Sequence, residues 1–241
     1  ATTNTGGTMS YTWVNDTPSI GLPASGNGNI ASFNANNSGL APVIATIIVT
    51  PHFLNGTATC NGPSQSFTIT VNPNAHVDTP ADQTICHNKL SAPVAFTTQN
   101  AGGTVAYTWT NNTPSIGLPA SGTGNIPAFA AQNPGSTAIT ALITVTPHFT
   151  NGTATCDGTS RSFTIKVNPL PVPHIFGAGS VCAGTTGVVY NSEPGNSSYS
   201  WTISSGGTFT AGPASNEITV AWNLIGAQTL TVNYTDPNGC T

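Results

Sequence analysis

Residues 107–129 read YTWTNNTPSIGLPASGTGNIPAF, and a close copy of this motif, YTWVNDTPSIGLPASGNGNIASF, occupies residues 11–33, 96 positions earlier. Working outward, residues 1–73 align with residues 97–169 without a gap, and about two thirds of the aligned pairs are identical. A period of 96 residues is too long for a solenoid, whose repeats span about 20–50 residues. It fits an independently folding β-sandwich domain of about 100 residues.

The pattern of side chains along the repeat indicates strands. Ile139, Ala141, Ile143 and Val145 alternate with Thr140, Leu142, Thr144 and Thr146. A period of two is typical of half-buried strands. The chain is also rich in Thr, Gly (26 residues) and Pro (19 residues), and poor in helix formers such as Glu, Lys and Met. The sequence therefore predicts an all-β fold of tandem immunoglobulin-like β-sandwich domains joined by short Pro-rich linkers.

Two proline-containing segments mark the expected domain boundaries: Asn72-Pro73-Asn74 and NPLPVP at residues 168–173. Proline donates no backbone hydrogen bond, so each segment should end a strand, and the second should form a stiff, extended linker. We expect a first domain at 1–73 that lacks its N-terminal strands, a complete domain at 74–169, and a diverged domain at 170–241 that lacks its last strand.

The first domain has no counterpart of residues 75–96, a segment that we expect to hold two strands. The simplest explanation is that the chain is a piece of a longer array of such domains. The alternative is that a partner chain supplies the missing strands by β-augmentation.

The low charge of the chain excludes several functions. It has 3 Lys and Arg residues and 7 Asp and Glu residues, which together make up only 4% of the sequence. Three basic residues cannot neutralise a run of phosphates, so we expect no nucleic-acid partner. The same shortage disfavours an anionic membrane surface, and no apolar stretch approaches the roughly 20 residues of a membrane span. We therefore expect no membrane insertion.

The cysteines fall at related places in the repeats. Cys86 opens the second domain and Cys156 lies near its last hairpin, while Cys182 and Cys240 occupy the same relative places in the third domain. We therefore expect the disulfides Cys86–Cys156 and Cys182–Cys240, one per domain. Cys60 matches Cys156 but its partner would precede residue 1, so truncation should leave it unpaired. Such regular bridges are typical of an oxidising, extracytoplasmic setting.

An aromatic pair recurs in every repeat, and its members are candidate core residues. The pairs are Tyr11 and Trp13, Tyr107 and Trp109, and Tyr199 and Trp201. Because the two residues of each pair share one strand face, we interpret them as core anchors. The alternative is a platform on which a sugar ring stacks. We also expect Trp222 to be a core residue.

No residue pattern points to catalysis, a metal site or a cofactor. The seven acids form no evident general acid–base pair, and no CxxC motif or Cys/His cluster is present. Asp78, Asp82 and Asp236 are candidate calcium ligands at domain junctions, but no DxDxD cluster is present, so we interpret them as turn formers. His52 and His148 are repeat-equivalent and should lie in different domains. We expect no enzyme activity.

The motifs at 107–129, TVTPHF at 144–149 and SFTIKVNP at 162–169 resemble the tandem PKD-like domains of very large surface proteins of Bacteroidota. NYTDPNGC at 233–240 is similar to a more distant member of the same superfamily. The resemblance implies an immunoglobulin-like sandwich, export by the type IX secretion route and display on the cell surface. Some proteins of this kind resemble the giant adhesin of gliding motility.

These observations favour a non-catalytic structural and adhesive segment of a secreted cell-surface protein. Its expected partners are neighbouring repeats of the same chain and surface polysaccharide, and it needs no cofactor. The alternative function is an accessory carbohydrate-binding or spacer module of a secreted polysaccharide-degrading enzyme.

Overall fold

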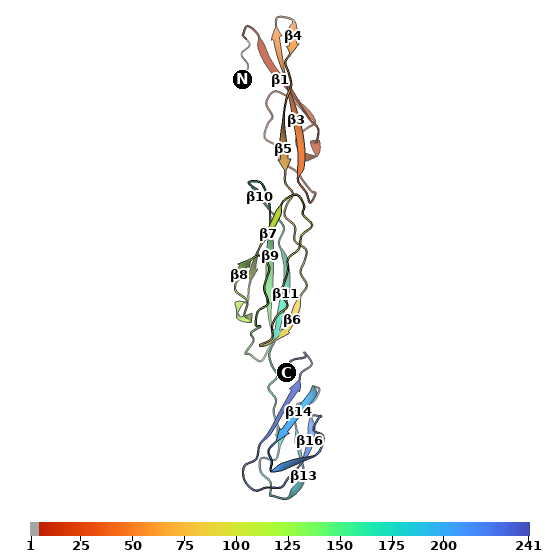
Figure 1. Cartoon of the computed structure of the whole chain (residues 1–241), viewed down its shortest axis with the longest axis vertical. Coiled ribbons are helices and arrows are strands. Elements are labelled where there is room, and N and C mark those ends of the chain that lie inside the picture. The colour runs from red at the N-terminus through yellow and green to blue at the C-terminus, as the bar shows by residue number, and fades with distance from the viewer. Residues whose placement is uncertain (1–4) are drawn as a thin grey trace.

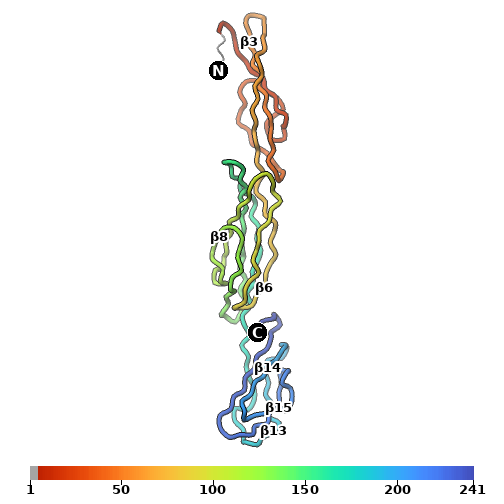
Figure 2. Tube along the Cα trace, in the orientation of Figure 1, coloured from red at the N-terminus to blue at the C-terminus, as the bar shows by residue number. Residues whose placement is uncertain are grey.

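The computed structural model describes residues 5–241 as three β-rich bodies that follow one another along a rod (Figures 1 and 2). We call them units one, two and three, using the domain ranges expected from the sequence; residues 1–4 of unit one lie outside the described residues. The predicted all-β fold is confirmed. Within residues 5–241 the helical segments are two single turns, η1 (Pro18–Ile20) and η2 (Pro114–Ile116).

Unit one is built on a single antiparallel sheet. Its strands are β1 (Thr8–Asn15), β2 (Ser25–Asn27), β3 (Val43–Asn55), β4 (Ala58–Asn61) and β5 (Gln65–Val71). The long strand β3 pairs with β1 on one side and with β4 and β5 on the other, and β2 extends the sheet beyond β1. In the described part of the chain nothing pairs with the outer edge of β5.

Unit two repeats this sheet and adds one strand. Its strands are β6 (Gln83–Cys86), β7 (Thr104–Asn111), β8 (Ser121–Thr123), β9 (Ile139–Asn151), β10 (Ala154–Asp157) and β11 (Arg161–Asn168). The added strand β6 lies parallel to β11, with Ile165 opposite Gln83 and Asn168 opposite Cys86. β6 therefore closes the sheet edge that unit one leaves open.

Unit three is a two-sheet sandwich. One sheet holds β12 (Phe176–Gly177), β13 (Thr185–Asn191), β15 (Gly207–Ala211) and β16 (Glu217–Trp222), and the other pairs β14 (Ser197–Ile203) with β17 (Leu230–Thr235). Its buried core comprises Tyr190, Trp201, Ile218, Val220 and Trp222.

The segment 75–96 contains one strand, not the two that we expected. After β6 it makes only single bridges, Leu90 with Ala130 and Val94 with Ile126. Pro93 lies between these bridges and cannot donate to a ladder, which accounts for the interruption. The segment still covers the core of unit two, because Val77, Val94 and Phe96 are buried in it.

In the aromatic motif, the strand that carries the tryptophan pairs with a short strand that carries a glycine, and the indole ring packs on that glycine. In unit two the indole of Trp109 packs on Gly122 of β8, and a Cβ atom there would lie 2.2 Å from the ring carbon Cζ2. Gly26 has the same relation to Trp13 in unit one. Between each pair runs TPSIG, a turn that ends on Gly117 in unit two with φ of 95°, a left-handed conformation that favours glycine.

The two joints of the rod are held differently. At the first joint, Ala101 N–H donates to Leu40 O at 2.9 Å, and Asn100 Nδ2 donates to Leu40 O and Asn74 O at 3.2 and 3.1 Å. Asn151 Nδ2 also donates to Asn72 Oδ1 at 2.9 Å. At the second joint the described residues form no such hydrogen bonds, and a disulfide crosses between the units.

Replacing Gly122 by Ala should destabilise unit two by about 1–3 kcal/mol, because the new methyl group overlaps the buried indole of Trp109. Urea unfolding followed by tryptophan fluorescence measures this loss. Ser121→Ala, at an exposed position of the same strand, is the matched control and should change the free energy of unfolding by less than about 0.5 kcal/mol. Equal effects of the two changes would contradict the packing described.

Candidate functional site at the joints between units

The second joint contains the one disulfide of the described residues. It links Cys86 at the end of β6 to Cys240, with 5.5 Å between the two Cα atoms. Cys240 is fully buried in a turn that folds back from unit three. In that turn Asp236 Oδ1 accepts hydrogen bonds from the N–H groups of Asn238 (2.9 Å) and Cys240 (2.8 Å). Burial raises the pKa of Asp236, but hydrogen bonds from Asn238 and Cys240 outweigh it and leave the pKa below its ordinary value.

The expected pairings Cys86–Cys156 and Cys182–Cys240 are wrong in this structure. Cys86 lies beside Asn168, next to the β9 residue Ile139, whereas Cys156 lies opposite Phe149 at the other end of β9. Ten residues of strand separate these two ends, about 33 Å at 3.3 Å per residue. A disulfide requires Cα atoms within about 7 Å, so the two cysteines of unit two cannot meet.

The remaining cysteines are free in the structure. Cys156 is half-buried in β10, where unit two faces unit one, and Cys60 is exposed in the equivalent strand β4 at the outer end of unit one. Cys182 is exposed at the outer end of unit three, where Gly184 N–H donates to Trp222 O. Each unit therefore places its cysteines at its ends, not across its core.

The recurring tryptophans lie in the cores of the units. Trp13, Trp109 and Trp201 are each only 5–6% exposed, so none presents a ring face on which a sugar could stack. Tyr11, Tyr107 and Tyr199 are partly exposed at the margins. Tyr107 packs against Phe96, with 5.4 Å between ring centroids, and burial raises its pKa above the ordinary value.

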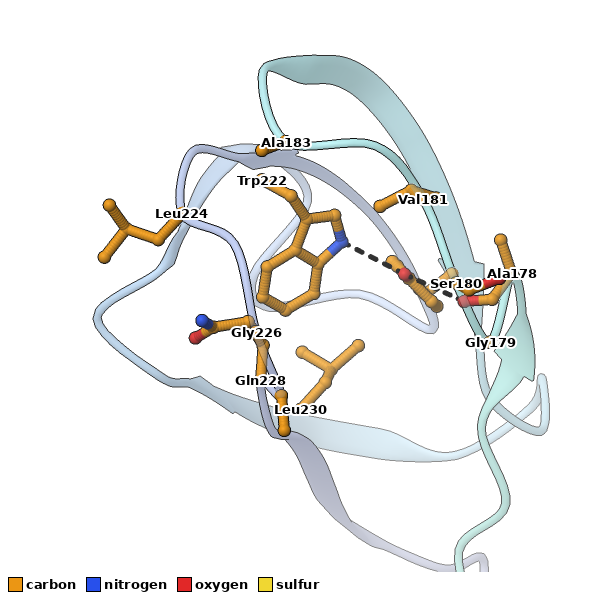
Figure 3. A pocket seen from close by; sticks show the side chains of 12 residues that line it. Ala178, Gly179, Ser180, Val181, Ala183, Trp222, Leu224, Gly226, Gln228 and Leu230 are labelled. Atoms are coloured by element: carbon orange, nitrogen blue, oxygen red, sulfur yellow. Dashed lines mark hydrogen bonds between the residues drawn. The ribbon is translucent and has the colours of Figure 1, made fainter.

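Unit three contains a pocket of about 440 Å³ at its outer end (Figure 3). Trp222, which is buried as expected, forms one wall, and its Nε1 donates to the Tyr190 hydroxyl at 3.0 Å. That hydroxyl donates in turn to Ala178 O at 3.1 Å. The other lining residues are small or apolar except Ser180 and Gln228, and no acid, base or histidine lines the pocket.

The histidines and acids that the sequence singled out are engaged locally. His52 and His148 each bond a threonine of the neighbouring strand, and His148 Nδ1 lies 2.6 Å from Asp157 Oδ1. Asp78 accepts from Thr97 and Gln99, and Asp82 accepts from the N–H of Thr164. Among residues 5–241 no three potential metal-ligating side chains gather in one place.

Glu193 fixes the exit of the second linker onto unit three. Its carboxylate accepts from the backbone N–H of His174 at 3.1 and 3.2 Å, lies 2.8 Å from His174 Nδ1, and accepts from Ser192 Oγ at 2.8 Å. Burial raises the pKa of Glu193, but these hydrogen bonds and one from its own backbone outweigh it and lower the pKa to about 2.

Comparison with known proteins identifies a family for one part of the chain. Residues 168–241 match the family model of the PKD-like domain. No curated protein matches the chain.

Among solved structures, human CDH23 EC21-23 is 15% identical, with 90% of this chain and 80% of that chain covered and a TM-score of 0.38. Domains 1-6 of the surface layer protein SbsC are 13% identical, with 92% and 29% covered and a TM-score of 0.25. In the described part of the chain no helix has the length and hydropathy to span a membrane.

Peptide mapping under non-reducing conditions should recover the peptide containing Cys86 linked to the one containing Cys240, because their Cα atoms are 5.5 Å apart. Alkylation before digestion should label Cys60, Cys156 and Cys182. Recovery of a Cys86–Cys156 link would show that the units are bridged internally instead.

Glu193→Gln should lower the unfolding temperature of unit three at neutral pH, since the charged carboxylate is hydrogen-bonded in the folded state. The folded pKa, about 2, lies below the ordinary 4.5, so the stabilisation is complete above pH 4.5 and is lost as the pH falls toward 2. Calorimetry across this range should therefore show the two proteins converging at low pH. If the difference in unfolding temperature between the two proteins did not change with pH, the charge of Glu193 would not be the source of the stabilisation.

Proposed function

We propose that this chain is a non-catalytic, load-bearing segment of an extracellular repeat protein, made of three domains at residues 1–73, 74–169 and 170–241. The observation that carries the proposal is the covalent link Cys86–Cys240, which joins successive units at a joint that the structure otherwise leaves without hydrogen bonds. Two of the five cysteines thus join neighbouring units, and no disulfide lies within a unit in the described residues.

The disulfide changes how the chain would transmit a pulling force. Tension that reaches Cys86 passes through the sulfur atoms to Cys240 and bypasses the polypeptide between them. That bypassed stretch, a sequence separation of 154, includes most of unit two and unit three. Their strand ladders and cores therefore carry little of the load, which suits a stalk that must stay folded under tension.

The outer end of unit three supports an array of neighbouring repeats. Ile225 is 88% exposed and Leu224 is 56% exposed, and both follow Trp222. The carbonyl of Trp222 accepts from the N–H of Gly184, two residues after the exposed Cys182. Cys182 is equivalent to Cys86 by the 96-residue offset, and Cys86 faces the next unit. An apolar, cysteine-bearing end is the surface on which a following domain would pack.

The resemblance of residues 107–129, 144–149 and 162–169 to tandem domains of Bacteroidota supports a more specific assignment. On this assignment the protein is exported by the type IX route, is displayed on the cell surface and acts in adhesion, with gliding motility as its setting. The nearly uncharged, Thr-rich surface suits contact with polysaccharide without electrostatic steering.

The alternative function, a carbohydrate-binding module, depends on exposed aromatic rings. None of the four tryptophans offers such a ring, because Trp13, Trp109, Trp201 and Trp222 are all buried. Contact with polysaccharide, if it occurs, would use hydroxyl and amide groups of the strand surfaces.

Single-molecule pulling from the two termini tests the load-bearing role. At about 3.3–3.6 Å per residue, the 154-residue separation conceals about 500 Å of extensible chain. We expect the oxidised chain to release only the part outside the disulfide, and the Cys86→Ser variant to release about 500 Å more at comparable forces. Cys60→Ser is the control that should leave the extension unchanged. Equal extensions of the oxidised chain and the Cys86→Ser variant would refute the bypass.

A further inference from the structure

The open edge of β5 in unit one can be compared with the equivalent edge of β11 in unit two, which is paired with a strand. There β6 lies parallel to β11, and the N–H of Thr164 donates to Asp82 at 2.6 Å. The chain after β6 continues the contact, since His87 N–H donates to Asn168 O at 2.8 Å and Ala131 N–H donates to Lys89 O at 2.8 Å. Residues 5–241 provide unit one with no equivalent of these bonds.

The open edge leaves apolar side chains of unit one in water. Phe67 is 46% exposed, whereas its repeat equivalent Phe163 is 3% exposed. Ile69 is only partly buried, whereas its equivalent Ile165 is fully buried. The buried core of unit one has 6 residues and that of unit two has 14. The difference follows from residues 75–96, because Val77, Val94 and Phe96 have no counterparts among residues 5–73.

A cavity of about 440 Å³ lies where the missing strand would run. It is lined by residues 69–72, which are the equivalents of the β11 residues paired with β6, and by residues 35–37, the equivalents of the loop that contacts the chain after β6. We call this cavity the strand groove. Its shape is therefore set by the same residues that hold β6 in unit two.

The strand groove ends at a free thiol. Cys156 of unit two lines it together with Ala154 and Asn72. Cys156 lies in β10, four residues after Gly152, and Cys240 directly follows Gly239 in the turn that folds back from unit three. At the second joint the cysteine opposite Asn168 is bonded to Cys240. A strand in the groove would place its last residue opposite Asn72, in the position that corresponds to Cys86.

We propose that the strand groove binds a polypeptide strand of the repeat type, parallel to β5, whose terminal cysteine forms a disulfide with Cys156. The occupant has the chemistry of residues 75–96: a short strand like QTIC, followed by apolar side chains that cover Phe67 and Ile69. This is independent of the load-bearing role, because it concerns completion of a sheet and a covalent link at the first joint.

The bond forms by thiol–disulfide exchange, with a low-molecular-weight disulfide as the oxidant. The donor cysteine first carries a small thiol as a mixed disulfide. The Cys156 thiolate attacks the donor sulfur, the new bond between the two cysteines forms as the bond to the small thiol breaks, and the small thiol leaves as its thiolate and takes up a proton. Atoms and electrons balance without another reagent.

A synthetic peptide with the sequence of residues 75–96, carrying glutathione on its cysteine, tests the proposal on the intact 241-residue chain. We expect one peptide to add by mass spectrometry, and peptide mapping to locate the link at Cys156. The matched control is the same peptide with the change Ile85→Asp, which keeps the cysteine but places a charge in the strand. It should react at least tenfold more slowly.

Hydrogen exchange gives a readout that does not need the disulfide. In the Cys156→Ser variant, an excess of the peptide should still slow exchange of the β5 amides, because the strand pairs with that edge. Cys60→Ser and Cys182→Ser should react like the unmodified chain. Equal addition at Cys60 and Cys156, or equal rates for the two peptides, would show simple thiol exposure and overturn the proposal. A dimer linked through Cys156 of two chains, formed in preference to the peptide adduct, would also overturn it.

Discussion

The length of one strand sets the layout of units one and two. In unit two β9 has 13 residues, about 43 Å of extended chain, and β7, β10 and β11 pair directly with it. The strand β11 and its parallel partner β6 lie at one end, and the hairpin to β10 lies at the other. Cys86 and Cys156, which belong to the same unit, are therefore held at opposite ends of it. The ends of neighbouring units, by contrast, come together, and the chemistry of the molecule is concentrated there.

The sequence predicted the architecture because the repeat and the alternation of apolar residues are local signals. Ala141, Ile143 and Val145 are fully buried as their period of two indicates. The disulfide pairing was not predictable in the same way. Because Cys86 and Cys182 occupy equivalent positions in the repeat, they are expected to form the same kind of bond. The repeat alone does not show whether the disulfide partner of each lies in the same unit or in the next one. Only the strand register, which sets Cys86 beside Asn168, decides between them.

The low charge of the chain limits the kinds of contact that can hold the joints together. The chain has only 10 Asp, Glu, Lys and Arg residues among 241. In the described residues neither joint is held by an ion pair between units. The first joint uses amide groups, with Asn100 and Asn151 donating to unit one and to the linker. Amide contacts change little with salt or with pH in the neutral range, whereas contacts between exposed ions weaken as salt is added.

The bond between Cys86 and Cys240 also has a consequence for degradation. The Pro-rich linker at 169–173 lies wholly inside the closed loop, so both the backbone and the sulfur bridge connect unit two to unit three. An extracellular protease that cuts the linker once would open the loop without releasing either piece. Separation of unit three from unit two would therefore require two independent events, cleavage of the linker and reduction of the disulfide.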